Sequence, residues 1–401
     1  MKFIAAALTV HATIDLPFTP EDWTNAHEYC QPTYPSLDTY RPLQGYELVS
    51  VQLVTRHGDR APANALPSHD TWDCRESVIL GETIFEVTPK TGQNSYCKGT
   101  NPLPRDICKR GQLTSKGQKQ METLGIRLSQ VYKGFVTSKD DLTIRSTDSD
   151  RCIESAMALA KGFLPNEPTI EITTRPMEKD NMVYYGHVCP KQARLTKELG
   201  QSHKVHAPQL WFAHLHPEIP IPTIAGPEYA IHIMTDLPRC RYCHGKPPRN
   251  NTSMDNVIAA LNAQNRVMMF DLATKTLHRL RVGNFLLEIK HNILLQKKFH
   301  YFSGHDLTVS ALLSALGIRK TRVPSYSANL LIEVWAPKAL PTPAIAEHRL
   351  RFIYNGIPID VPWTTLGEFF THLESNLDLI GGFEPHQSPS TFNYTLECQL
   401  D

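Results

Sequence analysis

The chain has 401 residues, of which 41% are hydrophobic and 20% are charged, the balance of a packed globular protein with one large domain or a core and a smaller companion. Its formal net charge of +1 excludes a global basic field that would collect nucleic acid or anionic lipid, so an anion site has to be local. No later segment approaches the roughly 18 apolar residues that indicate a membrane-spanning helix.

The first 44 residues form a lead-in that is rich in proline and polar residues. Lys2 precedes an apolar run at residues 3–10, which is at the short end for a signal peptide. A truncated or partly wrong start of the chain is the alternative interpretation.

Nine cysteines stand mostly in polar or proline- and glycine-containing stretches. They favour disulfides and the oxidising secretory pathway, whether Golgi, lysosomal or extracellular. An odd number leaves at least one thiol outside intrachain disulfides, and we expect this to be Cys152, inside a helical pattern. Glycosylation sequons at Asn250, Asn251 and Asn393 agree with a secreted glycoprotein, although such triplets often arise by chance.

Alternating apolar residues predict that the core begins with a buried strand from Leu48 to Arg56. Residues 61–110 then form a long loop region with several prolines. A helix with an inward apolar face follows from near Ser115. A second strand is expected at residues 142–144, and another helix follows it.

Residues 166–255 have less regular patterns and many prolines, histidines and cysteines, so we interpret them as a cap inserted into the core. The core returns with a helix around residues 280–295 and a strand at 299–303. A further helix is closed by Gly317, and a buried strand follows at 329–335.

Asn355 and Gly356, between two apolar runs, indicate a hairpin that adds antiparallel strands at one edge. Elsewhere strands alternate with helices, which predicts a parallel sheet. We therefore expect an α/β fold: a three-layer core with a central mixed, mostly parallel sheet and a smaller, mainly helical cap. The lead-in comprises residues 1–44, the core comprises 45–165 and 256–401, and the cap comprises 166–255.

Three segments share the order strand, polar residues, helix. They are residues 56–60 (RHGDR), 145–151 (RSTDSDR) and 303–306 (SGHD). Because ligands bind outside the carboxyl ends of strands in open α/β sheets, we expect the three segments to meet at one edge of the sheet. Two arginines beside a histidine repel one another unless an anion lies among them, so the sequence predicts an anion site.

A phosphate monoester is the anion that explains these residue types best. Arg56, Arg60 and Arg151 would bind its oxygens through forked, permanently charged donors, aided by a helix N-terminus near Arg151. His57 would attack phosphorus as a neutral imidazole, the form that the surrounding arginines favour.

The third segment would complete the reaction. His305 would stabilise the equatorial oxygens, and Asp306 would protonate the leaving alkoxide. A phosphohistidine would form first and water would then hydrolyse it, with charge stabilisation from arginine and no metal.

Two charged groups near these segments are expected to be structural. Arg145 would pair with Asp148 or Asp150. Asp59 would be a turn carboxylate that partners an arginine.

The blocks "RHGDRAP", "LTIRSTDSDRCIESA" and "FSGHDLTVSALLSALG", in this order, resemble the histidine acid phosphatases, the RHGxRxP branch of the histidine phosphatase superfamily. The resemblance implies an acid phosphatase without cofactors that acts on a phosphorylated small molecule, glycan or protein. It implies the same roles as above: nucleophile His57, acid Asp306, and phosphate ligands Arg56, Arg60, Arg151 and His305.

The resemblance also implies one disulfide. "GHVCPKQAR" resembles the Cys-Pro segment of acid phosphatases, and "NYTLECQL" resembles their C-terminal cysteine, which pairs with it. The expected bond joins Cys189 to Cys398 and would hold the chain end, which normally frays.

The substrate is less defined than the reaction. "LPRCRYCHG" and "RFIYNGIPID" resemble a Golgi subgroup of the family that acts on the glycosaminoglycan linkage region, whereas "RSTDSDR" is closer to ordinary acid phosphatases. A phytase-like hydrolase is another alternative. A phosphoryl-transferring mutase and a binding protein without catalysis are weaker ones, because Pro62 and the His-Asp pair favour hydrolysis and all six key positions are intact.

Residues 240–244 (CRYCH) match the attachment pattern of c-type haem, so an electron carrier is a remote alternative. The pattern occurs once, in a proline-rich segment without a small helical domain around it. Zinc would need two further ligands, for which His232 or His244 is only a loose match. Disulfides are the expected state of these cysteines.

Overall fold

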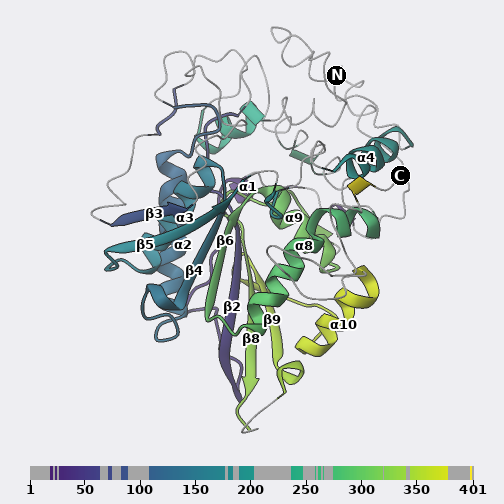
Figure 1. Ribbon diagram of the computed structural model, residues 1–401. Helices are drawn as coiled ribbons and strands as arrows, with labels where there is room; N and C mark the ends of the chain where they lie inside the picture. The colour runs from purple at the N-terminus through teal and green to yellow at the C-terminus, as the bar shows by residue number, and fades with distance from the viewer. Residues whose placement is uncertain are drawn as a thin grey trace.

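The computed structural model describes residues 19–20, 23–24, 27–63, 71–74, 83–88, 108–176, 179–183, 189–202, 236–246, 258, 261–262, 265, 274–318, 320–339, 344–377 and 398–399. Its centre is one sheet of eight strands in the order β10-β9-β8-β2-β6-β4-β5-β3 (Figure 1). These strands are β2 (Tyr46–Arg56), β3 (Ile84–Thr88), β4 (Leu142–Thr147), β5 (Thr169–Arg175), β6 (Phe299–Gly304), β8 (Asn329–Pro337), β9 (Arg349–Tyr354) and β10 (Ile357–Ile359). The short strands β1 (Thr19–Pro20) and β7 (Lys320–Thr321) pair separately.

The sheet is mixed, as expected. Strands β2, β6, β4, β5 and β3 are parallel, whereas β8, β9 and β10 are joined to β2 by antiparallel pairing. Asn355 and Gly356 connect β9 to β10 with φ of 50° and 78°, the left-handed conformation of a two-residue hairpin loop. The hairpin predicted at this edge is therefore confirmed.

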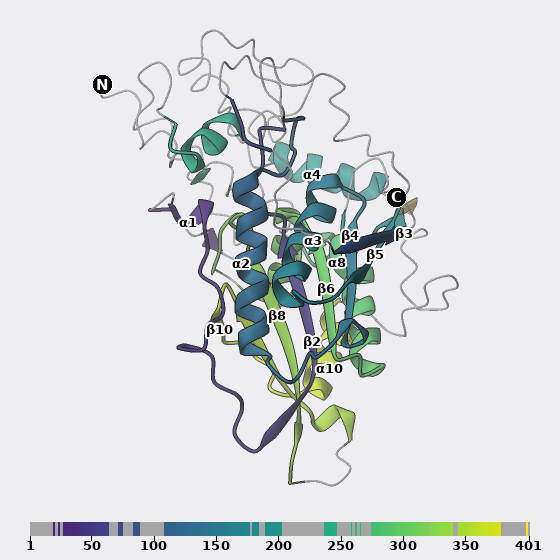
Figure 2. The ribbon, with the colours of Figure 1, turned by 90° about the vertical axis from the view of Figure 1, so that its left-hand side faces the viewer.

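Helices cover both faces of the sheet and make the three layers (Figures 1 and 2). On one face, α2 and α3 pack on Val51, Leu53 and Tyr301. On the other face, α8, α9 and α10 pack on Val54 and Phe302. The change of face between neighbouring residues follows the two-residue period of a strand. The helices are α1 (His27–Cys30), α2 (Ser115–Val131), α3 (Asp150–Phe163), α4 (Pro190–Ser202), α8 (Lys275–Leu294), α9 (Asp306–Ala315) and α10 (Leu366–Leu377), with 3₁₀ turns η3 (Lys139–Asp141) and η5 (Ile345–Glu347).

Two strands of the eight-stranded sheet, β5 and β3, lie in ranges for which no strand was predicted. β5 falls within the range expected to be cap, but it pairs with β4 and β3, so the core continues at least to Arg175. Its buried residues Ile170, Ile172 and Thr174 alternate with exposed ones, a period-two pattern that the polar threonines obscure in the sequence. β3 lies within the expected loop region. The other boundaries of the cap stay a prediction.

Three disulfides connect the described cysteines. The expected bond between Cys189 and Cys398 is confirmed, with Cα atoms 4.8 Å apart. Cys30 pairs with Cys243, and Cys74 pairs with Cys108. Such bonds indicate an oxidising compartment. Cys152 and Cys240 are buried and belong to no disulfide of the described residues, whereas Cys97, the apolar run at residues 3–10 and the three sequons lie outside them. No helix in the described ranges is long and apolar enough to cross a bilayer.

Helix α2 starts against the loop that follows β2. Thr114 caps the helix by accepting a hydrogen bond from the Gly117 amide. Gly117 lies so close to the loop that a Cβ atom there would come within 2.1 Å of the Asp59 carbonyl oxygen, and one on Gly58 within 2.4 Å of the Gly117 carbonyl oxygen. The absence of side chains at both positions lets the helix fix the loop.

This contact generates a prediction about packing. Gly117→Ala should lower the free energy of unfolding by about 1–3 kcal/mol, because overpacking against backbone outweighs the better helix propensity of alanine. Urea denaturation measures the change. Ser129→Ala, in the exposed last turns of the same helix, is the matched control, and an equally small effect of both substitutions would contradict the close-packing argument.

Candidate active site

The three predicted segments meet at one edge of the sheet. Arg56 pairs with Gly304 in the β2–β6 register, and Ser146 pairs with Ser303 in the β4–β6 register, so the three strands end side by side. Helices α3 and α9 start immediately after β4 and β6 (Figure 1). The parallel register brings together residues that are far apart in the sequence: Arg56 and Arg151 are 95 positions apart, and Arg151 and Asp306 are 155 positions apart. The predicted convergence is therefore observed.

His57 is buried in the centre of this group, with 2% of its surface exposed. Its Nδ1 atom lies 2.8 Å from the Gly58 carbonyl oxygen. A carbonyl oxygen can only accept, so Nδ1 carries the proton and Nε2 keeps its lone pair. The contact selects the tautomer in which Nε2 can act as a nucleophile.

The surroundings of His57 disfavour a second proton. Burial is the largest cause that holds the pKa of His57 well below the ordinary 6.5, and the charges of Arg151 and Arg56 act in the same direction. A second imidazole, His305, lies with its ring centroid 5.7 Å away. Its pKa is lowered to about 3, first by burial and then by the charge of Arg151. Both rings are therefore neutral over most of the acidic range.

Arg56 is fully buried and held on several sides. Its NH1 donates to the Pro324 carbonyl oxygen at 2.6 Å, and NH1 and NH2 each lie 3.2 Å from the Tyr29 hydroxyl. The guanidinium carbon lies 4.3 Å from the centre of the Tyr326 ring. NH2 also lies 3.1 Å from Asp306 Oδ2. Among the described residues, the buried Nε–H of Arg56 has no hydrogen-bond partner, which leaves one donor for a bound oxyanion.

Arg60 is held by a residue that the sequence did not indicate. Its NH2 lies 2.7 Å from Asp236 Oδ1, and Asp236 Oδ2 accepts a bond from the Ala63 amide at 2.7 Å. Asp236 begins the described helical residues 236–243, inside the expected cap. No local pattern marks this aspartate, because its partner is 176 residues away.

His305 and Arg151 orient each other. Arg151 NH2 donates to His305 Nδ1 at 3.2 Å, because a guanidinium cannot accept. The ring proton is then on Nε2, which lies 3.1 Å from Thr147 Oγ1. The Cys152 sulfur packs 3.7 Å from the same Nε2 and donates to the Gly304 carbonyl oxygen. Cys152 is thus a buried part of the wall of this site.

Asp306 is the first residue of α9. Its Oδ1 accepts the Leu307 amide at 2.9 Å, and Oδ2 faces Arg56. Burial, the largest single influence, would raise the pKa of Asp306, but the charges of Arg56, Arg239 and other neighbours together outweigh it, so the pKa lies below its usual range. The carboxylate is ionised when no other anion is present.

Two structural expectations are wrong. Arg145 does not pair with the nearby aspartates of its own segment but with Asp180 and Glu288, each at 2.5 Å. Asp59 contacts none of the described arginines; its Oδ1 lies 2.5 Å from His244 Nε2 and 2.6 Å from Thr114 Oγ1. Both side chains are buried, and their partners come from segments that are distant in the sequence but packed against them.

The haem interpretation of residues 240–244 is also wrong. Cys243 is bound to Cys30 in a disulfide, and His244 contacts Asp59, so neither is available to a haem. Cys240 is buried next to the Tyr326 hydroxyl. Within the described ranges, no group of three or more His, Cys, Asp or Glu side chains could hold a metal ion.

Comparison with known proteins agrees with this geometry. The model of the histidine phosphatase superfamily, branch 2, matches residues 47–210. Counting factor 60 of Dictyostelium discoideum is 26% identical over 82% of this chain and 84% of its own length. Human 2-phosphoxylose phosphatase 1 is 25% identical over 78% of this chain and 72% of its length, and human testicular acid phosphatase is 28% identical over 73% and 68%.

Solved structures share the fold. A Hafnia alvei phytase in complex with tartrate superposes with a TM-score of 0.60 at 12% identity, and covers 90% of this chain and all of its own. A phytase of Klebsiella sp. ASR1 gives 0.57 at 14% identity, over 85% of this chain and 96% of its own. The three ordered sequence blocks converge at one sheet edge, and over residues 47–210 the chain is similar to branch 2 of the histidine phosphatase superfamily, with phosphatases among its relatives.

Proposed function

We propose that the protein hydrolyses phosphate monoesters through a phosphohistidine on His57. The observation that carries the proposal is a buried, neutral imidazole whose Nε2 keeps its lone pair among three arginine charges. Arg56, Arg60 and Arg151 would bind the phosphoryl oxygens and stabilise charge in the transition state. The similarity of the chain to this superfamily and the phosphatases among its relatives support this reaction class.

The reaction balances in two steps. His57 Nε2 attacks phosphorus, the bond from phosphorus to the ester oxygen breaks, and Asp306 gives that oxygen a proton. Water then attacks phosphorus of the phosphohistidine, and Asp306 takes a proton from that water. The bond from phosphorus to His57 Nε2 breaks, and inorganic phosphate leaves. No cofactor takes part in either step.

The low pKa of Asp306 in the free protein opposes its role as an acid, but a bound phosphate changes the electrostatic balance around the carboxylate. The substrate brings negative charge among the arginines that stabilise the ionised carboxylate. It therefore weakens the influence of Arg56 and raises the pKa of Asp306 in the complex. The proton would be supplied most readily at acidic pH.

The substrate class is a phosphorylated small molecule, glycan or protein. A phosphorylated sugar is the specific candidate, because several relatives are 2-phosphoxylose phosphatases. A phytase-like activity is the second candidate; the superposition with phytases supports the fold alone. Phosphate release from a phosphoxylose glycan, phosphotyrosine and phytate, measured in parallel, distinguishes these substrates. The three disulfides support a place in the secretory pathway, in the Golgi, in lysosomes or outside the cell.

The first prediction of the mechanism concerns the nucleophile. His57→Ala should reduce phosphate release by at least about 10³-fold and abolish trapping of a phosphoenzyme, because both ring nitrogens of the neighbouring His305 are engaged, Nδ1 by Arg151 and Nε2 by Thr147. Circular dichroism should show an unchanged fold. Normal turnover in this variant would exclude the phosphohistidine mechanism.

The second prediction concerns the leaving group. Asp306→Asn should slow alkyl phosphates, which need a proton, far more than 4-nitrophenyl phosphate, which leaves as a stable phenolate. Steady-state kcat for the two substrates gives the comparison. If both lose the same factor, Asp306 acts on binding or on charge rather than as the acid.

The third prediction is the pH dependence. His57 must be neutral, and because its pKa is lowered, the nucleophile stays active well below pH 6.5. Asp306 must be protonated in the complex, so kcat should fall as pH rises through its pKa there. Activity should be higher at pH 4–5 than at pH 8 in profiles of kcat against pH. A rise in kcat with pH across the ordinary histidine range would mean that His57 titrates as an exposed histidine and would contradict its burial.

A further inference from the structure

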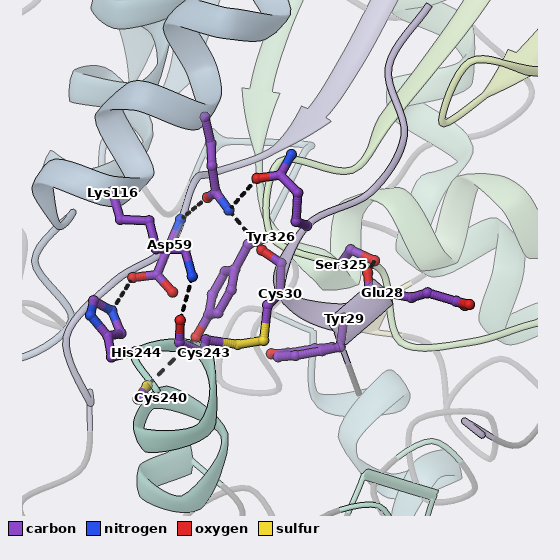
Figure 3. Close-up of a disulfide and its surroundings, with 12 residues drawn as sticks. Glu28, Tyr29, Cys30, Asp59, Lys116, Cys240, Cys243, His244, Ser325 and Tyr326 are labelled. Atoms are coloured by element: carbon purple, nitrogen blue, oxygen red, sulfur yellow. Dashed lines mark hydrogen bonds and ion pairs between the residues drawn. A yellow bond between two sulfur atoms is a disulfide. The ribbon is translucent and has the colours of Figure 1, made fainter. Parts of the chain in front are cut away.

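The disulfide between Cys30 and Cys243 lies directly behind the RHGDR loop, residues 56–60 (Figure 3). Each cysteine has a neighbour in sequence that contacts the loop. Tyr29 accepts hydrogen bonds from Arg56, the first residue of the loop. His244 contacts Asp59, the fourth residue. We call the four residues Tyr29, Cys30, Cys243 and His244 the clamp.

The Tyr29 contact of the clamp is buried, and the His244 contact is partly buried. Tyr29 and Asp59 have no exposed surface, and Cys30 and Cys243 expose 4% and 6%. The Tyr29 hydroxyl lies 3.2 Å from NH1 and NH2 of Arg56, and His244 Nε2 lies 2.5 Å from Asp59 Oδ1. A change in the position of the clamp would therefore move both ends of the loop.

The clamp also connects to the elements around it. Gln120 of α2 donates to the Cys30 carbonyl oxygen and accepts from the Asp59 amide, and Lys116 donates to the Cys243 carbonyl oxygen. Asp236, which pairs with Arg60, lies in the same described helical residues 236–243 that carry Cys243. The disulfide thus joins the segment that holds Arg56 to the segment that holds Arg60.

Neither segment has much stability of its own. Helix α1 has four residues, and residues 236–243 make about two turns. Helices this short are not stable in water without tertiary contacts or covalent bonds. The positions of Tyr29 and Asp236 therefore depend on tertiary contacts and on the Cys30–Cys243 disulfide that joins their segments.

A third thiol nearby does not compete for this bond. Cys240 stands three residues before Cys243, but burial, with a further contribution from Asp236, raises the pKa of its thiol to about 12. A protonated thiol is a poor nucleophile for disulfide exchange.

We propose that the clamp positions the two phosphate-binding arginines, with Tyr29 as the positioning residue of Arg56 and the disulfide as the bond that keeps Arg56 and Arg60 in register. The proposal rests on the proposed function, because it assigns the arginines to phosphate. It goes further in giving a role to residues 29–30 and 243–244, which contact no reacting atom.

The chain offers a matched control for the disulfide. Cys30 and Cys243 are 213 positions apart, and Cys189 and Cys398 are 209 apart. The entropic stabilisation by a disulfide depends on the logarithm of loop length, so the two bonds should stabilise the fold equally. Among the described residues, only the first disulfide has sequence neighbours, Tyr29 and His244, that contact the RHGDR loop. Comparison of the two double variants separates positioning from stability.

The experiment measures inorganic phosphate binding in Cys30→Ser with Cys243→Ser and in Cys189→Ser with Cys398→Ser. Both should lower Tm by similar amounts. Titration calorimetry well below either Tm should give a phosphate Kd raised about tenfold or more in the first variant, the equivalent of one lost charge-assisted hydrogen bond, and changed less than about twofold in the second. The KM for 4-nitrophenyl phosphate should follow the Kd.

A single substitution tests the same proposal with the disulfide intact. Tyr29→Phe removes the hydroxyl that contacts Arg56 and keeps the ring, so the phosphate Kd should rise several-fold at an almost unchanged Tm. Tyr40→Phe is its control, because the Tyr40 hydroxyl donates to Glu333 at 2.9 Å, away from the loop. If the first double variant does not fold, the phosphate Kd values of Tyr29→Phe and Tyr40→Phe decide whether the clamp positions Arg56.

Two results would overturn the clamp: equal phosphate affinity in the two double variants, or wild-type affinity in Tyr29→Phe. Neither result bears on the nucleophile. Undiminished turnover in His57→Ala would refute the proposed function, and the phosphate Kd values would still show whether the clamp positions the arginines.

Discussion

The structure depends on the burial of the Arg56 guanidinium. A buried charge without partners would cost several kcal/mol, so the fold surrounds this one completely. Pro324 and Tyr29 provide oxygen acceptors, Tyr326 provides an aromatic face, and Asp306 provides the opposite charge. These partners come from the N-terminal segment, from the turn before β8 and from the start of α9. A single side chain thus links segments that are otherwise far apart in the sequence.

The same burial determines the electrostatics of the site. Three arginines can lie close together only because Asp306 and Asp236 offset part of their charge. Together with burial, which has the larger influence, the remaining positive charge keeps His57 neutral, and in the proposed mechanism it attracts the phosphate. Tautomer and protonation state are then both determined by the fold, since the Gly58 carbonyl oxygen selects Nε2 as the nucleophilic atom. In the proposed mechanism, His57 can attack phosphorus without a change in its tautomer or protonation state.

Close packing fixes the positions of the segments that carry the site, which charge interactions alone do not determine. Gly58 and Gly117 bring the loop against the start of α2, and Thr114 contacts Asp59 from the same turn. On the far side, the buried pairs of Arg145 with Asp180 and Glu288 hold the loop at residues 180–182, whose Met182 carbonyl oxygen accepts a bond from Thr308 in α9. The edge of the sheet that carries the site is therefore packed against the start of α2 on one side and against residues 180–182 on the other. This arrangement is consistent with a reaction that depends on charge and position rather than on a cofactor.

The sequence by itself determined the α/β class, the hairpin at Asn355-Gly356, the bond between Cys189 and Cys398 as implied by resemblance, and all six side chains that converge at the site. These features were predictable because each has a local signature: alternation, turn residues, or a motif between a strand and a helix. The tertiary structure decided the partners. Asp236 for Arg60, Tyr29 for Arg56, His244 for Asp59 and Glu288 for Arg145 all lie far away in the chain, and no spacing marks them. The strand β5 within the expected cap was missed for a related reason, since Thr174 on its buried face leaves only Ile170 and Ile172 to mark the alternation. Local patterns encode which residues carry chemistry, whereas the contacts that orient those residues exist only once distant segments pack together.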